Sequence, residues 1–356
     1  MVVTYVAGNR AIGTNAERLA LNSLQVSGVG GWKELARTSN SALPDVSSLP
    51  NKRYYMILNS MNSSSSNPAI YWRLNNDSTS SYSRRTNSLG GESAIISETA
   101  LNYITDSAGG SYSIPYFAVG YLANYSTKEK LVIAHGVNSK GGTGSGIIPA
   151  RLEFTGKWAN TSNSVSRIAV PSEAGTFASD GELVVLGWDP ADTHTTNFWT
   201  ELASTTLSST ASTIDSGTIP AKKYLWIQAF VKQASTYTVG LQFNSDNTSS
   251  YAIRYSGNGG ADGTSINTWK CASNYSSFGG GMFLNAFIIN NQSKEKLVIS
   301  HTNEVDTTGA GAASNRIEMV GKWANTSNQI TSIQLRKETG TGDLQSGTIM
   351  KVWGSD

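Results

Sequence analysis

An internal repeat constrains the fold of this chain more than any other feature of its sequence. Residues 128–135 (KEKLVIAH) recur as residues 294–301 (KEKLVISH), and residues 156–163 (GKWANTSN) recur unchanged as residues 321–328. Weaker matches follow in the same order, so few insertions separate the two copies. The repeating unit is far longer than the roughly 20–50 residues of a solenoid repeat. The sequence therefore predicts two tandem copies of one whole domain.

The repeat divides the chain into four expected segments. These are an N-terminal arm (1–30), a first domain (31–188), a linker (189–197) and a second domain (198–356). Each domain is expected to close on a tryptophan, Trp188 in the first copy and Trp353 in the second. The linker DPADTHTTN is short and polar, so we expect the two domains to touch. The arm has no counterpart in the second copy, which favours either an attachment device or a cap over an exposed sheet edge.

Short apolar runs separated by turn residues predict strands. Residues 54–58, 69–74 and 131–133 have strand length and composition, and residues 151–155 (RLEFT) alternate strictly between polar and apolar. Such alternation is typical of antiparallel sheets with one solvated face. We predict an all-β protein made of two tandem antiparallel β-sandwich domains of jelly-roll type. A short helix is expected only in the arm, at residues 14–21, where Thr14 and Glu17 match a capping box.

Composition excludes several classes of function. The net charge is +2 and no run of Lys and Arg occurs, which argues against nucleic acid as a partner. A single cysteine, Cys271, rules out a disulfide within the chain and a cysteine-based metal cage. No apolar stretch approaches the ~18 residues of a membrane-spanning helix. The first ten residues lack the pattern of a secretory signal, so we expect synthesis in a cytoplasm without general export.

The residues that usually carry chemistry are few. His135 and His301 occupy equivalent positions at the end of a Leu-Val-Ile strand, and His194 lies in the linker. Equivalent histidines form one site only if the two domains face each other, so structural roles at strand ends are expected. Asp77 and Asp246 lie in matching turns that could offer oxygen ligands to Ca²⁺, although an Asx-type turn explains them better. We predict no enzyme activity, no cofactor and no metal site.

Two further patterns resemble catalytic elements without completing them. Residues 141–146 (GGTGSG) have the composition of a phosphate-binding loop but lack its Lys-Ser/Thr ending, so a strand connection is expected. Glu153 and Glu318 point outward from their strands beside Arg151 and Arg316. Ion pairing along the strand explains these carboxylates better than the paired acids of a glycoside hydrolase.

Four motifs, each present in both copies, carry a resemblance to a known family. They are WxELA at 32–36 and 199–203, PxK[RK]Y at 50–54 and 220–224, NxDxTSSY at 75–82 and 244–251, and GKWANTSN. Together they resemble a domain common in virion structural proteins of tailed bacteriophages, especially aquatic ones. The opening residues 5–18 also look like the start of such proteins. The resemblance covers nearly the whole chain, and its motifs are structural rather than catalytic.

The resemblance implies a place on the outside of a virion, on the head or the tail. A phage assembles in a reducing host cytoplasm, which fits the lack of disulfides. We expect a capsid decoration (cement) protein or a tail-appendage component that contacts other virion proteins, such as the major capsid protein, and forms a homo-oligomer such as a trimer. Docking is expected through the first domain and the arm, with candidate residues Tyr5, Arg10, Thr14, Glu17, Arg18 and Leu19.

The alternative is a carbohydrate- or receptor-binding adhesion module of tail-fibre type that contacts a host-surface glycan. Exposed aromatic rings make good platforms for stacking against sugars. The candidates are Trp72, Tyr82, Tyr251 and Trp269. Aromatic side chains exposed together at one domain end would favour adhesion, and their burial would favour passive decoration.

Overall fold

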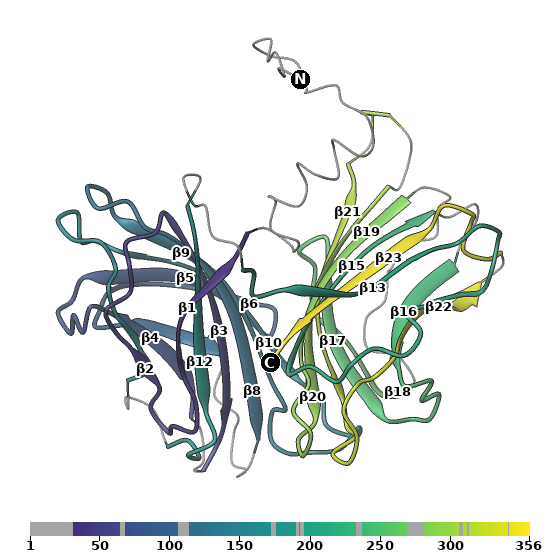
Figure 1. Cartoon of the computed structure of the whole chain (residues 1–356), viewed down its shortest axis with the longest axis horizontal. Helices are drawn as coiled ribbons and strands as arrows, with labels where there is room; N and C mark the ends of the chain where they lie inside the picture. Colours follow the sequence, from purple (N-terminus) through teal and green to yellow (C-terminus); the bar gives the residue numbers. More distant parts are fainter. Residues whose placement is uncertain are drawn as a thin grey trace, which may run out of the picture.

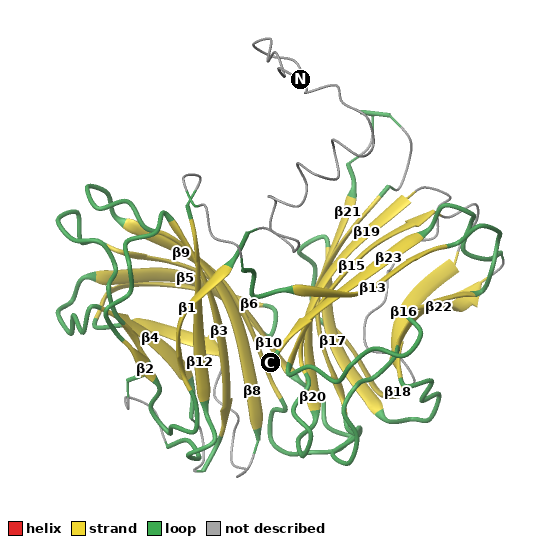
Figure 2. Cartoon of the chain, in the orientation of Figure 1, coloured by secondary structure: helices red, strands yellow, loops and turns green. Residues whose placement is uncertain are grey.

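The computed structural model of this chain shows a protein built from strands alone in its described part (Figure 2). The described residues are 31–64, 68–105, 114–171, 176–189, 192, 196–232, 237–268, 281–305, 309–311, 313–340 and 342–356. Within these ranges no helix is long and apolar enough to cross a membrane. The arm with its predicted helix lies outside the described residues, as do His194 and Cys271.

The first repeat (residues 31–188) forms two antiparallel sheets. The larger sheet has eight strands in the order β1-β12-β3-β8-β9-β10-β5-β6, and the smaller has the order β2-β11-β4-β7. The strands are β1 (Lys33–Thr38), β2 (Asp45–Val46), β3 (Tyr54–Asn62), β4 (Ile70–Leu74), β5 (Tyr82–Ser88), β6 (Gly91–Glu98), β7 (Leu101–Thr105), β8 (Pro115–Ala123), β9 (Lys130–Asn138), β10 (Ala150–Trp158), β11 (Ile168–Ala169) and β12 (Glu182–Trp188).

The second repeat (residues 198–356) reproduces this arrangement. Its larger sheet has the order β13-β23-β15-β19-β20-β21-β17-β18, and its smaller sheet has the order β14-β22-β16. The strands are β13 (Thr200–Thr206), β14 (Thr213–Asp215), β15 (Tyr224–Lys232), β16 (Tyr237–Phe243), β17 (Tyr251–Gly257), β18 (Gly263–Thr268), β19 (Gly281–Ile289), β20 (Lys296–Glu304), β21 (Asn315–Trp323), β22 (Ile333–Gly340) and β23 (Ile349–Ser355).

These sheets confirm the all-β, antiparallel prediction and refine it. A jelly roll has eight strands in two sheets, whereas each repeat has an eight-stranded sheet and a smaller one among its described residues. The jelly-roll part of the prediction was therefore too specific. No described sheet contains strands of both repeats. The boundaries at 31–188, 189–197 and 198–356 stay predictions of independent domains.

Strand register also corrects the expected equivalence of Trp188 and Trp353. The first residue of β1 pairs with Gly187, and the first residue of β13 pairs with Gly354. The two glycines therefore occupy equivalent positions in the two repeats. Leu186 is then the counterpart of Trp353, and Ser355 is the counterpart of Trp188. The two copies therefore end differently on this face of the sheet.

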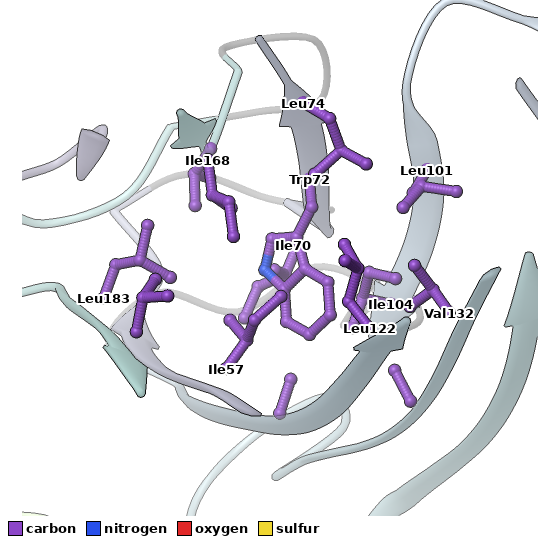
Figure 3. Packing of buried hydrophobic residues seen from close by; sticks show 14 of the residues in the cluster. Ile57, Ile70, Trp72, Leu74, Leu101, Ile104, Leu122, Val132, Ile168 and Leu183 are labelled. Carbon is purple, nitrogen blue, oxygen red and sulfur yellow. The ribbon is translucent and has the colours of Figure 1, made fainter. Parts of the chain in front are cut away.

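Each repeat is a sandwich whose core lies between its larger and smaller sheets. In the first repeat, Tyr55 and Ile57 of β3 share one apolar cluster with Trp72 of β4 and Ile168 of β11 (Figure 3). Trp72 lies at the centre of this cluster and is fully buried. Burial of one such large apolar side chain contributes about 1.5–3 kcal/mol relative to exposure, so this cluster is the main source of stability for the first sandwich.

The two larger sheets also pack on each other, so parts of both are buried on two faces. On β3 the alternate residues Met56 and Leu58 leave the sandwich core and join a second cluster with Trp226 and Phe287 of the second repeat. The rings of Phe117 and Tyr224 meet across this contact at 6.3 Å between centroids. We call this contact between the repeats the seam. In Figure 1 it lies at the centre, where β8 and β10 approach β20 and β17.

Buried polar groups reinforce the seam. Glu182 of β12 accepts hydrogen bonds from Ser39 (2.5 Å) and Tyr224 (2.7 Å) and lies within 3.0 Å of the Lys223 ammonium and 2.9 Å of the Arg37 guanidinium. Burial alone would raise the pKa of Glu182, but these hydrogen bonds and charges lower it below its ordinary value. The carboxylate is thus ionised and paired, and two of its partners come from the second repeat.

Candidate functional site

Three of the four aromatic residues proposed for sugar stacking are core residues. Trp72, Tyr82 and Tyr251 are 0 %, 1 % and 0 % exposed. The indole N–H of Trp72 donates to Asn59 at 3.2 Å, and the Tyr82 hydroxyl donates to the carbonyl of Leu74. These side chains are buried because they point between the two sheets of each sandwich, which corrects the stacking prediction. Trp269 and the docking candidates of the arm lie outside the described residues.

The turns of Asp77 and Asp246 anchor a buried tryptophan in each repeat. One oxygen of Asp77 accepts from the N–H and hydroxyl of Thr79, and the other accepts from Ser81 and from the indole N–H of Trp158, both at 2.7 Å. The same bonds recur around Asp246 and Trp323. Burial raises the pKa of Asp77, but these bonds outweigh it and lower that pKa to about 2. This geometry is that of an Asx-type turn whose carboxylate also accepts a hydrogen bond from an indole N–H.

A pocket lined by aromatic rings lies at one end of the outer face of the first repeat. It has a volume of about 450 Å³. Trp32 precedes β1, Tyr54 begins β3, Tyr121 lies near the end of β8 and Trp188 ends β12. Leu131 and Ile133 of β9 complete the floor. The lining residues are Trp32, Tyr54, Tyr55, Tyr121, Leu122, Ala123, Leu131, Ile133 and Trp188. We call this site the aromatic pocket.

Ring contacts hold the aromatic pocket open. Tyr54 and Trp188 stack at 5.5 Å with an angle of 22° between their planes, and Trp32 lies 6.4 Å from Tyr121. Tyr125 meets Tyr54 edge-on at 6.5 Å. Each of these rings contacts another ring. Such contacts restrict side-chain rotation, which reduces the side-chain entropy that is lost when a ligand binds.

The rim of the aromatic pocket supplies a few polar groups. The Arg53 guanidinium lies 5.5 Å from the centroid of the Tyr125 ring, and the hydroxyls of Tyr54 and Tyr125 lie 3.4 Å apart. This hydrogen bond raises the pKa of Tyr54, so its hydroxyl stays protonated at neutral pH. An apolar floor with a few polar groups at the edge suits a ligand with one flat apolar face and peripheral hydroxyls.

A second hollow of about 440 Å³ adjoins the aromatic pocket and shares Leu131 and Ile133 with it. Its other apolar wall is Ile95 and Ile96 of β6. Polar residues of β10 and β5, among them Thr155, Lys157 and Arg85, also line this hollow, so the two apolar walls are separated by a polar stretch.

Sequence reasoning missed the aromatic pocket because strand alternation does not tell which face of a sheet is covered. Tyr54 and Tyr55 are neighbours on β3, yet Tyr55 is buried in the sandwich and Tyr54 faces the pocket. A usable signal was present: the outer positions of β9, Leu131 and Ile133, are apolar although one face of an antiparallel sheet is usually solvated. Apolar residues on both faces of one strand indicate a second contact surface.

Comparison with known proteins assigns no family. No family model matches the chain, and no curated protein matches it. Among solved structures, mouse laminin α1 domains LG4-5 share 11 % identity over 92 % of this chain and 90 % of that one, with a TM-score of 0.20. Neisserial surface protein A shares 6 % identity over 81 % of this chain and 99 % of its own, with a TM-score of 0.11. A protein of Sulfolobus turreted icosahedral virus shares 11 % identity over the full length of both, with a TM-score of 0.13. Likeness at these scores carries no argument about function.

Proposed function

We propose that this chain is a non-enzymatic structural protein on the exterior of a tailed-phage virion, and that its first repeat binds a carbohydrate through the aromatic pocket. The observation that carries the proposal is the pocket lined by the half-buried rings of Trp32, Tyr54, Tyr121 and Trp188, which contact one another in pairs. The apolar face of a sugar ring stacks on such rings while its hydroxyls reach polar groups at the rim. The virion assignment rests on the four repeated motifs.

Binding of immobilised oligosaccharides tests the pocket directly. A panel of hexose, N-acetylhexosamine and deoxyhexose oligosaccharides is probed with the full chain and with the double variant Tyr54→Ala/Trp188→Ala. Loss of the stacked pair should weaken binding roughly tenfold or more, since each lost stack costs about 1 kcal/mol or more beyond its buried area. The control is Phe283→Ala, which removes an exposed aromatic side chain of the second repeat that lies outside the pocket. Equal binding by the double variant and the control would remove the pocket from the proposal.

A second candidate function is passive capsid decoration, which the burial of Trp72, Tyr82 and Tyr251 favours. Cryo-electron microscopy of the particle that carries this chain separates the two. Density at regular sites of the capsid lattice would support decoration. Density on the tail or projecting from a vertex would support host attachment. A particle without this chain would remove the virion assignment and leave carbohydrate binding.

The arm is proposed as the attachment device. Deletion of residues 1–30 should abolish incorporation into particles while the two repeats still fold, as followed by circular dichroism. Incorporation of the truncated chain at the level of the full chain would overturn this role for the arm.

A further inference from the structure

Two histidines that are 166 positions apart in the sequence meet at the seam. The ring centroids of His135 on β9 and His301 on β20 lie 4.3 Å apart. Histidines at equivalent repeat positions can share a site only if the two repeats face each other, and the packing of the larger sheets meets that condition. Glu153 of β10 completes the group, because one ligand atom from each of the three residues lies within 4.8 Å of the others.

We propose that His135, His301 and Glu153 form a binding site for a divalent transition metal, with Zn²⁺ as the ion of best fit, which ties the two repeats together. Two imidazoles and one carboxylate are a ligand set that zinc takes in proteins, with water in the fourth position. Magnesium and calcium prefer all-oxygen sites and fit this set poorly.

Strand register explains why these three side chains converge. Glu153 is paired with His135 in the β9–β10 ladder, so both project from the same face of the sheet at neighbouring positions. His301 is paired with Glu318 in the β20–β21 ladder in the same way. The seam therefore brings together two copies of one His–Glu pair. Each ligand position is set by a sheet rather than by a loop, which favours a site of fixed geometry.

An unpaired nitrogen points to a ligand at this place. Nδ1 of His135 is buried and has no hydrogen-bond partner among the described residues. A buried polar atom left without a partner is uncommon and costs free energy, and a metal ion would satisfy it. As whole residues, the three side chains are partly buried.

The surrounding charges restrict which carboxylate can bind the ion. Glu153 contacts the Arg151 guanidinium through Oε1, and Oε2 lies outside that ion pair. Arg151 also pairs with Asp262 of the second repeat at 2.6 Å. Glu318 is paired with Arg316 at 2.6 Å and is not one of the three clustered ligands. The structure thus assigns one carboxylate to the site and leaves the other outside it.

Equilibrium dialysis of the full chain against ZnCl₂, with metal content measured by mass spectrometry, tests the site. We expect one Zn²⁺ per chain, and at least a tenfold weaker affinity in His135→Gln and in His301→Gln. His194→Gln is the matched control, because His194 is the remaining histidine of the sequence. Glu153→Gln should weaken binding, whereas Glu318→Gln should retain it. Unchanged affinity in both histidine variants, or no saturable binding by the unaltered chain, would overturn the proposal.

A second measurement guards against variants that fold poorly. Zn²⁺ should raise the thermal unfolding midpoint of the unaltered chain and of His194→Gln, since a ligand that binds only the folded state stabilises it. The midpoint of the double variant His135→Gln/His301→Gln should not respond. An equal rise in the double variant would place the ion elsewhere and overturn the site. Neither measurement depends on carbohydrate binding or on a place in a virion.

Discussion

The two copies of the KEKLVI motif have the same backbone and different surroundings. In the first repeat Leu131 and Ile133 are 57 % and 53 % exposed, whereas their counterparts Leu297 and Ile299 are 0 % and 2 % exposed. The difference arises because Leu297 and Ile299 pack against the first repeat at the seam. The same motif thus forms the same strand in both repeats, and contact with the other repeat determines whether the outer face of that strand is exposed or buried.

The charged pair beside this motif shows the same contrast. Glu129 and Lys157 form an ion pair whose side chains are 39 % and 44 % exposed, whereas the equivalent Glu295 and Lys322 are 1 % and 0 % exposed. A first-repeat loop covers the second pair: Ser139 donates to Glu295 at 2.6 Å, and the N–H of Gly144 donates at 2.5 Å. The glycine suits this place because its φ of +96° is unfavourable for other residues.

The buried lysine of this motif, in contrast, makes the same contacts within each repeat. The ammonium of Lys130 donates to three backbone carbonyls, those of Ser126, Lys128 and Asn160, and Lys296 makes the equivalent three bonds. Both lysines are fully buried. These hydrogen bonds within a repeat are therefore determined by its own sequence, whereas burial of its outer face is determined by contact with the other repeat.

The largest expected difference in stability between equivalent substitutions in the two repeats concerns the buried ion pair. Lys322→Ala should lower the free energy of unfolding by about 3–5 kcal/mol, because it leaves Glu295 buried without its cation. Lys157→Ala should cost about 1 kcal/mol or less, since the exposed pair is screened by water. Urea unfolding measures both. The double variant Lys322→Ala/Glu295→Gln should recover part of the loss, and equal costs at Lys157 and Lys322 would contradict the burial difference.

The next effect concerns the apolar residues of the same motif. Leu297→Ala should lower the free energy of unfolding by about 2–4 kcal/mol through lost burial and a cavity in the seam. Leu131→Ala should change it by about 0.5 kcal/mol or less, as is usual at a surface position. Thermal and urea unfolding of the two variants check the ratio. A loss at Leu131 as large as at Leu297 would mean that the outer face of β9 is covered in solution.

The smallest effect should be equal in the two repeats. The carboxyl of Asp77 has its pKa lowered to about 2 in the folded chain, against about 4 in an unfolded chain. The stability that this group contributes is therefore complete above about pH 4 and is lost as pH falls toward about 2. Asp77→Asn should remove this part of the pH dependence and cost about 1–2 kcal/mol at pH 7.

Asp246→Asn is the matched variant in the second repeat, because Asp246 makes the same bonds to Thr248, Ser250 and Trp323. Acid titration of stability, followed by tryptophan fluorescence, compares the two. Similar losses would sharpen the distinction between local and assembly-dependent contacts. A loss of stability confined to one repeat would show that contact between the repeats affects these turns as well.

Much of the fold could be predicted from sequence because it depends on local patterns. Residues 151–155 alternate strictly, and they form part of β10. The Asp77 turn was recognised as an Asx-type turn from its Asn, Ser and Thr neighbours, and its bonds agree. The ion pairs of Arg151 with Glu153 and of Arg316 with Glu318 were likewise expected from adjacent outward positions.

The candidate sites could not be predicted in the same way, since they depend on which faces meet. Ile70, Trp72 and Leu74 are alternate residues of β4 and share a face, but the strand alone does not show which face is covered, so Trp72 was a stacking candidate although it is buried. Nothing local to His135 indicates that His301 lies beside it, because the two belong to different sheets. The aromatic pocket joins Trp32, Tyr54 and Trp188 from three strands that are neighbours only in the sheet.

The unequal cover over the two KEKLVI strands also has an evolutionary consequence. A duplicated gene begins with two identical copies, but selection does not act on them equally. A mutation at Leu297 must be compatible with a packed neighbour, whereas a mutation at Leu131 meets only the demands of a surface and of any ligand that surface binds. The outer face of β9 at Leu131 and Ile133 is therefore freer to change than the matching face of β20, which the seam constrains.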